Sequence, residues 1–180
     1  AAVYRAVDDG LDAHVYRIGR LVGRGTDGKF QKNPDSNAFY VFLKAIGMAG
    51  AIPESMASAE LELTPVDECA KAIVALHDTT LTTLHLASPH SVPVREIIGL
   101  NPKIKIVKDQ DYGRVLKELA LLGVGHETTP LLDFFNGEQG TKQKIAVSTI
   151  ITQNELAARG IQWNKIPAST LLSEFIVVKD

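Results

Sequence analysis

Two short patterns in the sequence have the spelling of a dinucleotide-dependent redox site. Residues 23–28 read Gly-Arg-Gly-Thr-Asp-Gly, which matches the G-x-G-x-x-G turn that binds a pyrophosphate at the start of a helix. Tyr40 and Lys44 are spaced so that a helix would bring them to one face. There a tyrosine hydroxyl can act as general acid and the lysine can lower its pKa. Whether either pattern does this chemistry depends on the elements that position it.

The segment after the glycine turn does not support nucleotide binding. Residues 29–34 read Lys-Phe-Gln-Lys-Asn-Pro, which is polar, ends in proline and has no apolar stripe. A pyrophosphate site needs the N-terminus of a helix at this point. No acidic residue about 20 positions after the turn ends a second strand, where a ribose would be bound. We therefore expect a flexible loop on the substrate side, and cofactor binding by this loop stays open as the alternative.

Tyr40 and Lys44 also lack the chain that such an oxidoreductase places before them. Only 39 residues precede Tyr40, which is too few for a complete nucleotide-binding half. We expect an amphipathic helix in which Tyr40 is half-buried and Lys44 lies in solvent.

The other reactive side chains are isolated. The five histidines show no pair at metal-ligand spacing on a helix, so no metal site is expected. Cys69 lies beside alanines near the start of a predicted helix, where it is expected to pack as a small apolar side chain. A single cysteine excludes an intrachain disulfide and fits a reducing, cytoplasmic compartment. No residue of the chain is assigned a catalytic role.

The composition is that of an ordinary globular domain. The chain has 180 residues, of which 45% are hydrophobic and 22% are charged, and this excludes disorder. The formal net charge is −2 and the basic residues are scattered, so nucleic acid is not an expected partner. No run approaches the roughly 18 apolar residues that span a membrane, and the first residues do not resemble a signal peptide.

Helical and strand patterns alternate along the chain, which indicates an α/β or mixed α+β fold with some parallel pairing. Strands are predicted at residues 14–18, 60–63, 83–87, 103–107 and 145–151. Helices are predicted over the first nine residues up to Gly10, and from residues 91–93, Thr129 and Ser169 onward. Further helices are predicted to begin at an N-cap: Asp35 or Ser36 for a helix that ends near Gly50, then Asp67, Asp111 and the capping box that starts at Thr152.

Several segments, in their order and spacing, resemble the terminal thioester reductase domains of nonribosomal peptide synthetases. They are residues 15–19, 26–31 with Asn33, 37–40, 63–67, 84–86 and 156–163. These domains are extended short-chain dehydrogenase/reductases, in which an N-terminal Rossmann lobe binds NADPH and a C-terminal lobe shapes the substrate site. They reduce the thioester that holds a peptide on the phosphopantetheine arm of a carrier domain, and they release an aldehyde or an alcohol.

The resemblance is to the second half of such a domain. It implies that residues 1–180 form a single fragment, the C-terminal substrate-binding lobe without the N-terminal Rossmann nucleotide-binding half. The family's glycine-rich nucleotide turn and its catalytic Ser/Thr, Tyr and Lys are expected before Ala1. The fragment is therefore expected to be inactive alone and not to bind NADPH alone. Its implied partners are the missing nucleotide-binding half and a phosphopantetheinylated carrier domain with its peptidyl thioester.

The same resemblance implies a small set of site residues. Arg17 and Gly19 are expected near the cofactor, and Gly28, Phe30 and Gln31 are expected to border the substrate pocket. Two other functions stay open: a non-enzymatic module that docks a carrier protein, and a different extended short-chain reductase or epimerase.

Overall fold

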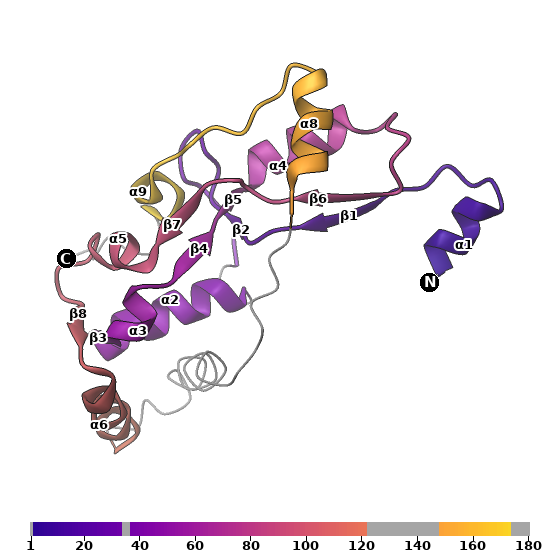
Figure 1. Ribbon diagram of the computed structural model, residues 1–180. Coiled ribbons are helices and arrows are strands. Elements are labelled where there is room, and N and C mark those ends of the chain that lie inside the picture. Colours follow the sequence, from indigo (N-terminus) through magenta and orange to yellow (C-terminus); the bar gives the residue numbers. More distant parts are fainter. Residues whose placement is uncertain (1, 34–36, 122–147, 174–180) are drawn as a thin grey trace.

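The strands of the molecule are short and lie in pairs (Figure 1). The computed structural model describes residues 2–33, 37–121 and 148–173. Within these ranges three strand pairs are parallel and one is antiparallel. The parallel pairs are β1 (Val15–Ile18) with β6 (Thr83–Leu86), β2 (Leu21–Val22) with β5 (Thr64–Pro65), and β3 (Ala51–Pro53) with β8 (Lys105–Val107); β4 (Glu60–Glu62) runs antiparallel to β7 (Ser91–Pro93).

Helices alternate with these strands, so the predicted mixed α/β class is confirmed. None of the helices in the described ranges is long and apolar enough to cross a bilayer. Their bounds are α1 (Ala2–Asp8), α2 (Ala38–Ala49), α3 (Glu54–Ala57), α4 (Val66–Ala75), α5 (Val94–Ile98), α6 (Asp109–Leu121), α8 (Ile150–Ala158) and α9 (Ala168–Leu171).

The larger of two hydrophobic clusters, here called the large cluster, is built around α2. This helix presents a buried stripe because apolar residues recur at helical spacing. The side chain of Asn37 accepts hydrogen bonds from the amides of Phe39 and Tyr40 at the first turn, and Gly50 ends the helix at a φ of 60°. The cap is therefore Asn37 rather than the predicted Asp35 or Ser36. Side chains from β2, β3, β4, β7, α3, α5, α6 and α9 also belong to this cluster.

The smaller cluster, here called the small cluster, lies between the β1–β6 pair and the two helices α4 and α8 (Figure 1). Alternation along β6 buries Leu84 and Leu86, and Leu156 of α8 packs with them. Tyr16 of β1 packs against the same cluster, and its hydroxyl donates to the carbonyl of Leu76 at 3.2 Å. In the part of the chain that the structure describes, β1 pairs through one edge only.

Two predicted elements near α8 differ from the structure. The strand predicted at residues 145–151 is wrong where it is described, because Ile150 and Ile151 begin α8 and are exposed. Thr152, predicted to cap this helix, lies inside it, and its hydroxyl accepts a hydrogen bond from the amide of His85 at 2.9 Å. The hydrogen bond to His85, which is distant in the sequence, takes the hydroxyl that the local pattern predicts as a helix cap. Residues 145–147 and the helix predicted from Thr129 lie outside the described residues.

Other predicted boundaries shift by a few residues. Residues 91–93, predicted to start a helix, form β7, and α5 follows at Val94. The helix predicted from Asp111 begins at Asp109. The carboxylate of Asp109 accepts from both the amide and the hydroxyl of Ser55, so the start of α6 is tied to α3.

Candidate functional site

A cavity of about 570 Å³ lies at the carboxyl ends of β1 and β6. Ligands commonly bind at this edge in α/β proteins, because the loops that follow parallel strands converge there. The register pairs Arg17 with His85 and Ile18 with Leu86, so the residues after both strands meet. We call this the Glu62 cavity, and its walls are residues 17–19, Glu62, His85, residues 87–89, Ser91 and Thr149.

Gly19 shapes one wall of the Glu62 cavity by its lack of a side chain. A Cβ at this position would lie 2.6 Å from both Glu62 Oε2 and Thr64 Oγ1, and 2.8 Å from the Cβ of Ala87. These distances are well inside van der Waals contact, so only glycine fits without displacing the wall. The amide of Gly19 donates to the carbonyl of Leu86 at 2.9 Å, which extends the β1–β6 ladder by one residue.

The carboxylate of Glu62 ties together the segments around the cavity. It accepts hydrogen bonds from the amide of Arg20 at 2.7 Å and from the amide of Ser88 at 3.2 Å. It also accepts from the hydroxyl of Thr64, whose oxygen in turn accepts from the Ser88 amide at 3.0 Å. Because both carboxylate oxygens are engaged, Glu62 fixes the cavity wall rather than standing ready as a general base.

Arg17 supplies a positive charge at the same cavity. Its side chain is exposed, and it has no hydrogen-bond or ion-pair partner among the described residues. A guanidinium in this position can bind a phosphate or carboxylate group of a ligand in a bidentate manner. The arrangement therefore suits binding and orientation of a partly anionic ligand.

The Gly23–Gly28 turn is closed by the protein itself. A pyrophosphate cradle needs backbone amides that are free to donate. The three glycine amides instead donate within the protein: Gly23 to the carbonyl of Leu171 at 3.2 Å, Gly25 to the carboxylate of Asp67 at 2.8 Å, and Gly28 to the carbonyl of Arg24 at 2.8 Å. In this structure the turn is a structural loop and does not present the donors of a dinucleotide site.

Asp67 holds that loop from the first turn of α4, not from the N-cap position. The predicted N-cap role is wrong, because Pro65 precedes α4 and Asp67 lies in the first turn. Its carboxylate accepts from the Gly25 amide and, at 3.3 Å, from the hydroxyl of Thr26. Burial raises the pKa of Asp67, but hydrogen bonds from the backbone amides of Gly25 and Glu68 outweigh that effect and leave the pKa lowered.

The three residues predicted to border the substrate do not line the Glu62 cavity. Gly28 lies against α9, where a Cβ would come within 2.1 Å of the carbonyl oxygen of Thr170. The ring of Phe30 packs on Tyr40 with the centroids 4.6 Å apart. Gln31 is exposed and hydrogen-bonds within its own loop. The structure thus brings Arg17 and Gly19 together in one cavity and places the other three in the loop that packs against α2 and α9.

Tyr40 and Cys69 are both core residues. Tyr40 is 2% exposed, which is more buried than the sequence predicts, while Lys44 is exposed. Burial raises the pKa of the Cys69 thiol, and the negative charge of Glu62 raises it further. Within the described ranges, no group of three or more His, Cys, Asp or Glu side chains is placed to hold a metal ion.

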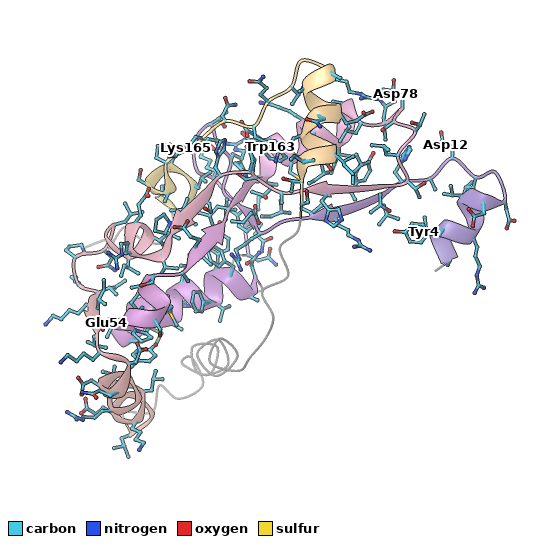
Figure 2. All side chains as sticks on the ribbon, in the orientation of Figure 1. Tyr4, Asp12, Glu54, Asp78, Trp163 and Lys165 are labelled. Carbon is cyan, nitrogen blue, oxygen red and sulfur yellow. The ribbon has the colours of Figure 1, made fainter. Side chains whose placement is uncertain are left out.

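A second cavity of about 450 Å³ adjoins the first, and the two share Ser88 and Ser91. Its outer wall includes the segment between α8 and α9, on which Figure 2 labels Trp163 and Lys165. We call it the Lys165 cavity, and its walls are Leu63, Pro65, Ser88, residues 90–93, Glu96, residues 164–167 and Leu171.

Sequence reasoning missed the residues that shape these cavities. Glu62 stands in an alternating strand beside Glu60, where both read as ordinary solvent-facing residues. Ser88 follows a predicted strand, which would mark it as a site residue only if that strand were known to run parallel to β1. The pairing joins Arg17 to His85, which are far apart in the chain, and no local signal records it.

Solved structures of reductase domains share this fold. The chain is 25% identical to an archaeal non-ribosomal peptide synthetase thiolation-reductase di-domain, with a TM-score of 0.78 over 97% of this chain and 38% of that one. It is 24% identical to the reductase domain of the aureusimine biosynthetic cluster, with a TM-score of 0.78 over 96% of this chain and 46% of that one. For the terminal R domain of the myxalamid pathway the identity is 25% and the TM-score 0.68, over 96% and 45%.

These similarities confirm the resemblance stated from the sequence and the fold that it implied. The chain spans less than half the length of each of these three solved structures. No protein-family model matches the sequence, and a search of curated proteins finds no match.

Proposed function

From the fold shared with nonribosomal peptide synthetase reductase domains, we propose that the chain is the substrate-binding portion of an NADPH-dependent thioester reductase. In this proposal the substrate is a peptidyl thioester on the phosphopantetheine arm of a carrier domain, and the released product is an aldehyde or an alcohol. The observation that carries it is the match over 97% of this chain to a thiolation-reductase di-domain. We place the activity in the cytoplasm, in keeping with a single, buried cysteine.

The Glu62 cavity supports a role in binding at the reacting end of the substrate. It lies at the carboxyl edge of a parallel strand pair, it carries the guanidinium of Arg17, which has no partner among the described residues, and Gly19 shapes its wall. In the proposal Arg17 and Gly19 lie beside the cofactor. Gly28, Phe30 and Gln31 support the substrate side indirectly, through the loop that packs against α9 and α2.

The described residues do not form a site for a whole dinucleotide, because the glycine amides of residues 23–28 already donate to protein acceptors. In the proposal NADPH is therefore held by a separate nucleotide-binding half, and the described chain alone does not bind it. The open edge of β1 and the exposed side chain of Ile18 suit contact with that half.

The test uses the 180-residue chain by itself and fused to the part of the archaeal thiolation-reductase chain that lies outside the matched region. Calorimetry of the chain alone with NADPH should show no binding. The fused protein should oxidise NADPH when given a carrier-bound peptidyl thioester, and an aldehyde or alcohol should appear. Arg17→Ala in the fused protein should slow this reaction, whereas Arg5→Ala, an exposed change on α1 outside the cavity, should not.

The outcomes separate the proposal from its alternatives. A folded fused protein that binds a carrier domain tightly and never oxidises NADPH would favour a docking module. Oxidation of NADPH with a sugar nucleotide or a free acyl substrate, and none with carrier thioesters, would favour a different extended reductase. Micromolar binding of NADPH by the chain alone would return the nucleotide role to the turn at residues 23–28.

A further inference from the structure

The Lys165 cavity is a pocket with an apolar floor and a charged mouth. The buried part of its wall includes Leu63, Val92 and Leu171, which are 1%, 9% and 2% exposed. The exposed part of the wall includes Glu96 and Lys165. Its volume of about 450 Å³ lies within the usual range for small-molecule sites, about 300–1,000 Å³.

The floor offers few hydrogen bonds to a ligand. Ser88 is the polar residue among its buried members, and its amide already donates to Glu62 and Thr64. The Ser88 hydroxyl accepts from the amide of His90 at 3.2 Å. A polar side chain entering this floor would leave its water hydrogen bonds without replacement, whereas an apolar side chain would lose nothing.

The outer wall is held in place before any ligand binds. Asn164 donates from its backbone amide and its side chain to the carboxylate of Glu68 on α4, at 3.2 and 2.6 Å. One residue earlier, the carbonyl of Trp163 lies 3.3 Å from Nε2 of His90. These two contacts fix the segment that carries Lys165 against the rest of the protein, so the cavity is preformed on this side.

We infer that the Lys165 cavity binds the apolar side chain of the acyl group whose thioester lies in the Glu62 cavity. This inference rests on the proposed function and adds a substrate class to it. The shared wall at Ser88 and Ser91 allows one ligand to occupy both cavities. The cavity therefore selects acyl groups that end in an aliphatic or aromatic residue over those that end in glycine or an acidic residue.

Two neighbouring residues of α5 provide a matched pair of variants. Glu96 and Arg95 are both exposed, but of the two only Glu96 lines the Lys165 cavity. Glu96→Trp should fill the mouth with an indole ring, and Arg95→Trp should place the same ring outside it. The probes are the N-acetylcysteamine thioesters of N-acetylleucine, N-acetylglycine and N-acetylaspartate, titrated into the 180-residue chain by calorimetry or NMR.

The leucyl probe should bind at least about tenfold more tightly than the glycyl and aspartyl probes, because even one methylene in a hydrophobic pocket typically gives about 10- to 200-fold. Glu96→Trp should remove that preference and Arg95→Trp should keep it. Circular dichroism checks the fold of each variant, and Lys165→Trp, expected to act like Glu96→Trp, replaces it if Glu96→Trp does not fold.

Equal binding of the three probes, no binding of any of them, or a leucyl preference that survives Glu96→Trp would overturn the inference. These readouts need no reduction, so they are separate from the test of the proposed function. Selective binding without NADPH oxidation by the fused protein would defeat the proposed function and leave the apolar site standing. NADPH oxidation at the same rate with all three acyl side chains would support the proposed function and overturn the inference about the Lys165 cavity.

Discussion

The two hydrophobic clusters of this chain are unequal in size. Among the described residues, the large cluster contains 20 buried residues and the small cluster six, so each side chain of the small cluster contributes a larger share of the apolar area buried there. In the described chain every strand lies in a two-stranded sheet, so the strands beside both clusters have an unpaired edge. The Glu62 cavity lies at the carboxyl ends of β1 and β6, which are the strands of this smaller region.

Polar contacts hold α8 in its orientation beside the small cluster. The hydroxyl of Thr79 donates to Glu155 of α8 at 3.0 Å. Arg159 pairs with Glu155 at 2.6 Å and with Asp78 at 3.2 Å, at the corner where Figure 2 labels Asp78. These contacts fasten α8 to the loop before β6. Both ion pairs are at least partly exposed to solvent, so they orient the helix more than they stabilise it.

Truncation of one side chain in each cluster should have the largest effect and should expose their difference. Leu156→Ala in the small cluster and Ile97→Ala in the large cluster should each lower the free energy of unfolding by about 3 kcal/mol. Urea unfolding measures this loss. Hydrogen exchange should show that Leu156→Ala opens β1 and β6 first, whereas Ile97→Ala weakens protection throughout. Uniform loss of protection in both variants would mean that the clusters unfold as one unit.

A pair of glycines should separate backbone strain from packing. Gly28 and Gly160 both have positive φ, 72° and 74°, but only Gly28 has backbone within the reach of a Cβ. Gly160→Ala should cost about 1 kcal/mol from the left-handed conformation alone. Gly28→Ala should cost about 3 kcal/mol, because α9 must also move away from the loop. Thermal unfolding measures the loss of stability in each variant. Equal losses would show that α9 can move away from the loop at no measurable cost.

The sequence predicted best what neighbouring residues decide. The apolar stripe of α2 and its end at Gly50 are local, as is the end of α1 before Gly10, and the structure has both. The predicted start of α8 is wrong because the hydroxyl of Thr152 accepts a hydrogen bond from His85, a strand residue far away in the sequence. The candidate site depends on the same kind of long-range pairing, so Arg17 and Gly19 were reached through a family resemblance and Glu62 was missed.

Removal of the Asp67 carboxylate should have a moderate, pH-dependent effect. The pKa of Asp67 is lowered in the folded protein from its ordinary 3.8, so its contribution is fully present above pH 3.8 and is lost as the pH falls through the folded value. Asp67→Ala should therefore cost about 1 kcal/mol at neutral pH, since the carboxylate is partly exposed and its hydrogen bonds are screened.

The same comparison at acidic pH supplies the control for Asp67. Urea unfolding of the wild type and Asp67→Ala should give converging stabilities below pH 3.8, because the protonated side chain no longer holds the loop as a carboxylate. Glu68→Ala removes the neighbouring hydrogen bonds to Asn164. In a Glu68→Ala background, the stabilities with and without Asp67→Ala should still converge at acidic pH. A gap that stays constant with pH would show that the loop is held by shape and not by charge.

Arg17→Ala should have the smallest effect on stability and the most specific effect on binding. Its side chain is exposed and unpaired among the described residues, so the free energy of unfolding should change by less than about 0.5 kcal/mol. In the fused protein, however, the Kd for NADPH should rise several-fold, because the guanidinium supplies the positive charge of the Glu62 cavity. Gly19→Ala is the matched opposite: it should disturb Glu62 and Thr64 and lower stability together with binding. If Arg17→Ala left the Kd for NADPH unchanged while Gly19→Ala raised it, binding would depend on the shape of the cavity wall and not on the charge of Arg17.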